Sequence, residues 1–303
     1  KETTKPVQSD YNKLVGRDTM AIKGLMGVIQ KENDYYLEIP KTLIGREILV
    51  SNKLLQVPQE LNEAGVNKGI NYENKTIKFE WEKGLNKLNI REQRLTPEVY
   101  SFYAMAPSVK DNYINPLIAS LKIEGVSKDS ASVVVKVTNL FNGKDECLND
   151  VFNLINLGTS ANSELSRILS MKAFDNNVAA TSELTTVVHE GKSKTNITIV
   201  VSTSLILLPS RPMMGRLENQ RVGYFTTSRL HYGDNQPEVA TKNYITRWNL
   251  EPKDTAAYMR GELVEPVKPI EFYIDYAVPA NILPYIKKGI LDWNKAFERA
   301  GFK

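Results

Sequence analysis

Short runs in which apolar and polar residues alternate cover most of the chain. Residues 76–81, Thr-Ile-Lys-Phe-Glu-Trp, carry apolar side chains on one face, as a half-buried antiparallel strand does. The strongest hairpin pattern joins residues 178–190 to 195–208 through a glycine-containing turn. Further strands are predicted at 24–30, 35–39, 46–50, 87–91, 99–103, 117–123, 132–137, 221–225 and 242–250. We therefore predict a β-rich α+β fold whose antiparallel sheets form a meander and a sandwich-like or barrel-like domain.

A three- and four-residue apolar spacing marks the few helices. It predicts helices near 150–174, at 150–155 and 163–174, and one at 279–301 that follows a strand at 270–274. The last helix aligns its apolar side chains on one face, namely Ile282, Ile286, Ile290, Trp293, Phe297 and Ala300. A face this wide has to pack on another element, so we expect a domain that begins here and continues beyond the sequence.

The changes in pattern predict four regions. Residues 1–18 form a polar linker, and residues 19–57 form a small N-terminal β meander. Residues 58–265 form the main β-rich domain, with the helices near 150–174. Residues 266–303 form the strand–helix pair that opens the next domain.

Charge and hydropathy limit the partners. The 39 basic and 35 acidic residues leave a net charge of +4 and are scattered, which argues against nucleic-acid binding. No apolar run reaches the roughly 18 residues of a membrane span. The chain opens on a polar segment at Lys1 rather than on methionine. That start suits either an exported protein that has lost its signal peptide or a trimmed chain, and both readings stay open.

Catalytic and metal-binding motifs are not found in the sequence. A metalloprotease helix needs two histidines four residues apart, but the position four residues after His189 is Ser193. We expect His189 at an exposed hairpin tip and His231 in an aromatic loop. Cys147 is the single cysteine, so an intrachain disulfide is excluded. Its neighbours are acidic, which disfavours the thiolate form. We therefore assign no catalytic and no metal-binding residue in this chain.

One segment carries an unusual composition. Residues 208–225 place arginines among prolines, methionines and glycines. Two readings stay open, a crossover loop between strands and a segment that docks on another domain, because arginine and aromatic side chains are favoured interface anchors. The candidate docking residues are Arg211, Arg216, Arg221, Tyr224 and Phe225.

The order of several motifs resembles the N-terminal region of large bacterial zinc-dependent metalloproteases of the metzincin type, which carry paired domains of unknown function. The matching segments are Tyr11-Asn-Lys-Leu14, Lys23-Gly-Leu-Met-Gly-Val-Ile29, Tyr36-Leu-Glu-Ile-Pro40, Gly45-Arg-Glu-Ile-Leu-Val50, Arg211-Pro-Met213, Arg221-Val-Gly-Tyr-Phe225, Arg247-Trp-Asn-Leu-Glu-Pro-Lys-Asp254, Arg260-Gly-Glu-Leu-Val-Glu-Pro266, Pro269-Ile-Glu-Phe-Tyr-Ile-Asp275 and Gly289-Ile-Leu-Asp-Trp-Asn-Lys-Ala-Phe-Glu-Arg-Ala-Gly-Phe302. The resemblance implies that the zinc-binding HExxHxxGxxH helix lies downstream of residue 303.

This resemblance sets the functional expectation. The chain would be a non-catalytic prodomain, folding scaffold or substrate-positioning module, and the full-length parent would be the zinc endopeptidase. Its partners would be its own downstream catalytic domain and, in the full-length protein, a peptide or protein substrate. Residues 266–303 would open the catalytic domain, with Ile286, Ile290, Trp293 and Phe297 as the packing helix. The family implies export to the periplasm, the outer-membrane surface or the medium. The alternative is a free-standing β-rich module that binds glycans or proteins.

Overall fold

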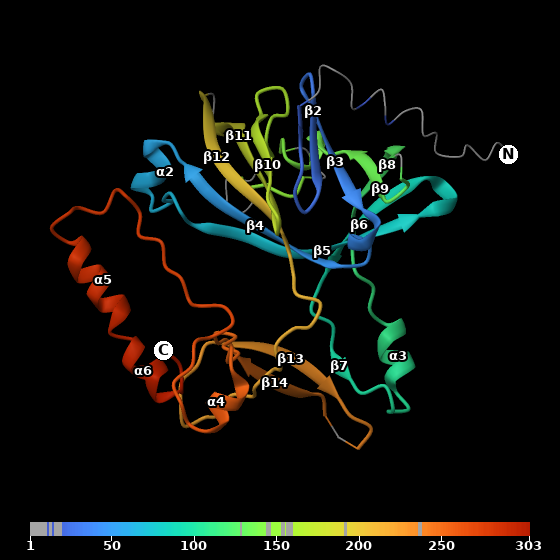
Figure 1. Cartoon of the computed structure of the whole chain (residues 1–303). Coiled ribbons are helices and arrows are strands. Elements are labelled where there is room, and N and C mark those ends of the chain that lie inside the picture. The colour runs from blue at the N-terminus through green and yellow to red at the C-terminus, as the bar shows by residue number, and fades with distance from the viewer. Residues whose placement is uncertain are drawn as a thin grey trace. The chain divides into compact units, whose positions relative to one another are not determined.

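The computed structural model describes residues 11, 14, 20–127, 129–143, 147–152, 155, 160–190, 193–235 and 238–303. The chain divides into two compact units, Lys1–Pro212 and Met213–Lys303. Figure 1 shows the strands of the first unit in blue to yellow and the elements of the second in orange and red.

The first unit is built on a large antiparallel sheet. Among its described residues, eleven strands pair in the order β1-β2-β3-β9-β8-β6-β5-β4-β12-β11-β10. Their bounds are β1 Met20–Ile22, β2 Gly27–Lys31, β3 Asp34–Pro40, β4 Glu47–Gln56, β5 Asn71–Glu82, β6 Lys87–Gln93, β8 Leu117–Val126, β9 Ser132–Lys136, β10 Arg167–Ala173, β11 Asn177–Glu190 and β12 Ser193–Leu207. A short strand, β7 (Glu98–Val99), and the helices α2 (Gln59–Glu63) and α3 (Ala106–Asp111) lie between them. Three 3-10 turns occupy Lys41–Leu43, Lys83–Leu85 and Thr138–Leu140.

The sheet curls until its two ends meet. The backbone N–H of Leu25, just before β2, donates to the carbonyl of Phe174, just after β10, at 2.7 Å. Figure 1 shows β2 and β10 side by side at the top of the unit. Alternate residues of each strand point inward, and on β4 the inward positions are Ile48, Val50, Asn52 and Leu54, all buried. The interior is therefore a mainly apolar core, with a few buried polar side chains, enclosed by one sheet.

The second unit contains a strand pair and three short helices. Strands β13 (Thr226–Tyr232) and β14 (Ala240–Ile245) are antiparallel, and the helices are α4 (Thr255–Met259), α5 (Leu283–Leu291) and α6 (Asn294–Arg299). A small cluster of Ala257, Val264 and Phe302 is buried between α4 and the end of the chain. The Lys303 N–H donates to the Val264 carbonyl at 2.9 Å and holds the chain end in place.

The predicted β-rich α+β class with antiparallel sheets and few helices is confirmed. The helix predicted at 163–174 is wrong, because β10 covers Arg167–Ala173. Three- and four-residue apolar spacing also fits a strand with a bulge, and the register of β10 against β11 shifts between Ile168 and Ser170. Of the helix predicted at 150–155, residues 150–152 and 155 are not helical, and 153–154 lie outside the described residues.

The compact units divide the chain differently from the predicted domains. The strands of residues 19–57 belong to the same sheet as those that follow, since β3 pairs with β9 and β4 pairs with both β5 and β12. The two compact units are divided at Pro212/Met213, and the predicted boundaries at residues 57 and 265 stay predictions. Of the predicted linker 1–18, only Tyr11 and Leu14 are described, and the Tyr11 hydroxyl donates to Glu38 at 3.1 Å.

The C-terminal segment is less regular than its pattern indicates. Residues 270–274 adopt no strand in the described chain, where they have no partner to share backbone hydrogen bonds. The helix predicted over 279–301 forms as α5 and α6, interrupted at Asp292 and Trp293. Asp, Trp and Asn at 292–294 are weaker helix formers than the residues around them, which explains the break. Within the described residues, none of the helices is both long and apolar enough to span a membrane.

Candidate functional site

A loop in the interior of the first unit, residues 147–152, is held by buried polar side chains. Leu148, Val151 and Phe152 are fully buried against the sheet, and Asn149 between them is buried as well. A loop inside a core brings backbone N–H and C=O groups that must find partners there. Segment 147–152 therefore depends on the side chains that meet it.

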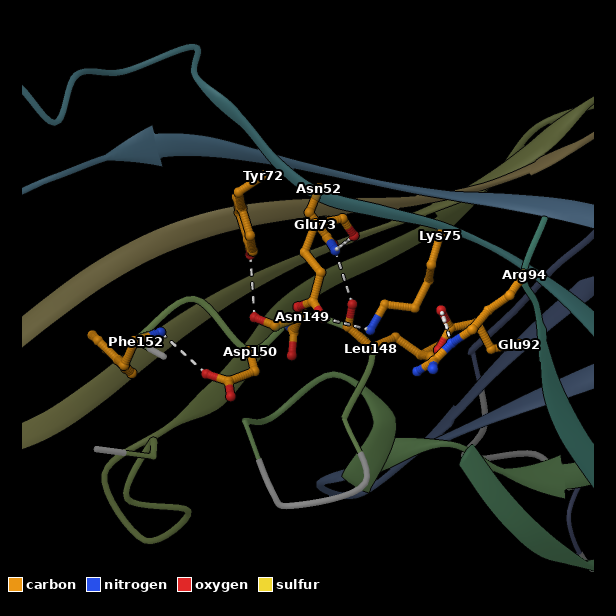
Figure 2. A network of polar contacts seen from close by, with 10 residues as sticks. All are labelled: Asn52, Tyr72, Glu73, Lys75, Glu92, Arg94, Leu148, Asn149, Asp150 and Phe152. Atoms are coloured by element: carbon orange, nitrogen blue, oxygen red, sulfur yellow. Dashed lines mark hydrogen bonds and ion pairs between the residues drawn. The ribbon is translucent and has the colours of Figure 1, made fainter. Parts of the chain in front are cut away.

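Asn52 supplies the central contact. Its side-chain amide donates to the Leu148 carbonyl at 2.9 Å and to the Glu73 carbonyl at 3.3 Å. Its backbone N–H donates to the Asn74 side-chain oxygen at 3.2 Å. Figure 2 shows the Asn52 amide between these two carbonyls, so that one buried side chain ties β4 to β5 and to the loop.

Tyr72 and Asn149 complete the anchor. The Tyr72 hydroxyl donates to the Asn149 carbonyl at 3.1 Å, and the Asn149 amide donates to the Phe141 carbonyl at 2.9 Å. The Asp150 carboxylate accepts from the Phe152 N–H at 3.1 Å (Figure 2). Burial raises the pKa of Tyr72 far above its ordinary value, so the hydroxyl stays protonated and remains a donor.

Cys147 lies beside this network. Burial, with smaller contributions from Asp150 and Glu73, raises the pKa of the thiol to about 11. The thiol is therefore protonated at neutral pH and poorly suited to act as a nucleophile or a metal ligand. Lys75 and Glu73 form an ion pair at 3.0 Å at the edge of the network. The arrangement can hold the loop in place.

The histidines lie apart from this network. His189 is exposed near the end of β11, opposite Lys194 on β12, as expected for a hairpin tip. His231 was expected in a loop, but it lies within β13 and is buried. The expectation is wrong because the Leu-His-Tyr pattern at 230–232 continues the strand. Among the described residues, no three His, Cys, Asp or Glu side chains are grouped so that they could hold a metal ion.

The five candidate docking residues are all exposed, and four of them lie in the second unit. Their segment runs along β14, where the Arg216 carbonyl accepts from the Ile245 N–H at 2.9 Å and the Phe225 carbonyl accepts from the Thr246 N–H at 2.8 Å. Arg221 contacts Asn219, and Tyr224 and Phe225 present their rings to solvent. Arg211 lies two residues before the second unit begins. The strand predicted at 221–225 is wrong, since the neighbouring strand starts at Thr226.

The four candidate packing residues of the C-terminal helices differ in how far they are buried. Phe297 packs against the small core of the second unit, whereas Ile286 and Ile290 are half-buried. Trp293 is 67% exposed, and Tyr285, which was not singled out from the sequence, is 75% exposed. The part of the apolar face that carries Trp293 is therefore exposed to solvent.

An aromatic cluster that the sequence pattern did not predict lies directly after β7. The rings of Tyr100 and Phe102 stack with centroids 5.3 Å apart, and Tyr103 meets Phe102 edge-on at 4.7 Å. Phe102 is 76% exposed. The signal in the sequence is Tyr-Ser-Phe-Tyr at 100–103, which falls in the strand predicted at 99–103, but β7 ends at Val99.

The fold and these sites define a β-rich module with an internally anchored loop and exposed aromatic surfaces. The chain belongs to the family described as Domain of unknown function (DUF5117), whose model matches residues 69–253, more than half of the chain. A second model, Domain of unknown function (DUF5118), matches residues 8–57. The predicted pair of domains of unknown function is thereby confirmed. No curated protein and no solved structure matches the chain.

Proposed function

We propose that this chain is the non-catalytic N-terminal region of an exported bacterial zinc metalloendopeptidase of the metzincin type. It would serve the downstream catalytic domain as a prodomain, folding scaffold or substrate-positioning module. The motif resemblance supports the assignment to this class of protease. The uncovered apolar face of α5 and α6 supports the docking role.

The exposed face of α5 and α6 is the main observation that supports docking to a catalytic domain. Trp293, on the apolar face of α5 and α6, is 67% exposed, and Tyr285 beside that face is 75% exposed. Large aromatic side chains of this kind are common anchors of protein interfaces. Covering them with the sheet of a catalytic domain would bury apolar area that now faces water.

The zinc of the full-length protein would be held elsewhere. The described residues offer no three grouped ligands, so they do not fit a catalytic zinc site. The zinc would therefore be held by the downstream HExxH helix, and this chain would take part in no chemical step.

Amide hydrogen exchange in the full-length polypeptide tests the docking. Exchange of the α5 and α6 amides is expected to be slower in the full-length polypeptide than in residues 1–303 alone. Trp293→Asp should abolish this difference, because it puts a carboxylate on the apolar face. Lys295→Asp is the matched control, since two residues turn the helix by about 200° and place the new charge on the polar side. Equal exchange rates in the two polypeptides would contradict docking.

The aromatic cluster favours a second candidate, a glycan-binding module. Stacked Tyr100 and Phe102 form an exposed aromatic surface, and aromatic rings favour the apolar faces of sugars. A glycan array with the wild-type chain and with Phe102→Ala separates the two functions. Binding that disappears in the variant would favour this candidate, and the lack of any binding would remove it.

A further inference from the structure

Four buried oxygen atoms inside the first unit have no hydrogen-bond partner in the described part of the protein. They are Asn52 Oδ1, Asn149 Oδ1, Ser182 Oγ and Thr203 Oγ1. All four residues are fully buried. Native proteins leave few such groups unsatisfied, so four in one interior call for an explanation.

Strand pairing brings three of these residues together. Thr203 on β12 is directly opposite Asn52 on β4. Ser182 on β11 pairs with Val201, two residues before Thr203, which makes Ser182 a diagonal neighbour of Thr203. Each residue lies between buried apolar residues of its strand, so all three side chains face the interior of the sheet.

Asn149 joins this group through the anchored loop. The Asn52 amide donates to the Leu148 carbonyl, and Asn149 follows Leu148 in the chain, so the Asn149 backbone begins beside this contact. The Asn149 amide N–H donates to the Phe141 carbonyl, so the Asn149 side-chain oxygen can accept a hydrogen bond from another donor. We name the four residues Asn52, Asn149, Ser182 and Thr203 the interior polar layer.

The chemistry of the interior polar layer points to water. The two amide oxygens only accept hydrogen bonds, and the two hydroxyls both donate and accept. A water molecule donates two hydrogen bonds and accepts others, and buried waters typically have two to four protein partners. We propose that the interior polar layer binds ordered water molecules that bridge the Asn52 and Thr203 oxygens and extend to Ser182 and Asn149. These waters would join loop 147–152 to strands β11 and β12, which the direct hydrogen bonds of Asn52, Tyr72 and Asn149 do not reach.

Water relaxation dispersion of the folded chain tests this site. The ¹⁷O dispersion amplitude counts water molecules that stay buried for longer than the protein tumbles. We expect Thr203→Val to lose amplitude equivalent to about one water molecule, because valine keeps the shape and removes the bridging hydroxyl. Thr181→Val on β11, adjacent to Ser182 and on the outward face, is the matched control and should leave the amplitude unchanged.

The sign of a stability change provides a second readout. A hydroxyl that truly lacks a partner is destabilising, so its replacement by a methyl group would raise the urea midpoint. A hydroxyl that binds water stabilises the folded protein, so its removal in Thr203→Val would lower the urea midpoint. Lost amplitude together with a lower midpoint supports the water site. Unchanged amplitude in Thr203→Val and in a second variant, Ser182→Ala, overturns it whatever the midpoint does.

Discussion

Gly24 lies so close to Phe174 that a Cβ atom on Gly24 would come within 2.6 Å of the Phe174 carbonyl oxygen. The next residue, Leu25, donates its N–H to that same carbonyl. The two ends of the sheet therefore meet backbone to backbone, with no room for a side chain. Glycine at position 24 is required by this contact.

Gly24→Ala should destabilise the first unit by about 1–3 kcal/mol, because backbone atoms rather than a flexible side chain would have to move. Urea unfolding measures the change. Gly84→Ala is the control, since nothing lies within 4 Å of a Cβ at that position, and it should change stability by less than about 0.5 kcal/mol. Equal effects of the two substitutions would mean that the ends of the sheet do not meet as described.

Asn52→Ala should destabilise the protein by about 1–3 kcal/mol, because it leaves the buried Leu148 carbonyl without its side-chain donor. The matched control is Asn89→Ala, which removes an exposed contact between the Asn89 amide and Glu82. Chemical denaturation gives both values. An Asn52→Ala midpoint as high as that of Asn89→Ala would show that the loop does not depend on Asn52.

The Cys147 thiol should make the protein less stable at alkaline pH. Its pKa of about 11 in the folded protein exceeds the value of about 8.5 for an unfolded chain. Between these values the unfolded chain loses the proton first, so the free energy of unfolding falls as the pH rises. Tyr72 contributes with the same sign at higher pH.

Comparison with Cys147→Ala isolates the thiol. Urea unfolding at pH 8, 9 and 10 should show a shallower decline in stability for the variant than for the wild type. Parallel declines would argue that the thiol is exposed in the folded protein.

Phe302→Ala should loosen the second unit while leaving the first intact. Phe302 is buried with Ala257 and Val264, and deletion of a buried phenylalanine ring typically costs about 3–5 kcal/mol. Hydrogen exchange should become faster in α4 and α6 and remain unchanged in β11 and β12. Faster exchange in all four elements would indicate that the two units unfold together.

Strong local patterns predicted the strands well. The hairpin predicted at 178–190 and 195–208 forms as β11 and β12, because two long runs joined by a tight turn leave little choice of partner. The alternation at 76–81 likewise marks the interior face of β5, where Ile77 and Phe79 are buried. In such elements the local sequence alone predicts the strand and the residues that face the interior.

The rest depends on contacts between segments distant in sequence. Residues 163–174 show a helical spacing, yet pairing with β11 draws residues 167–173 into the sheet. The Asn52–Leu148 contact joins residues 96 positions apart, and neither local sequence predicts it. The exposure of Trp293 was also not predictable, since an apolar stripe indicates that a face needs a partner but not whether the partner lies in the same unit.

Zinc content and peptide hydrolysis of the full-length polypeptide test the assignment to a metalloprotease. We expect bound zinc and cleavage of a protein substrate by the full-length polypeptide, and neither by residues 1–303. Trp293→Asp in the full-length polypeptide should lower the hydrolysis rate, and Lys295→Asp should not. A full-length polypeptide that is folded but contains no zinc and cleaves no substrate would contradict the assignment to a metalloprotease.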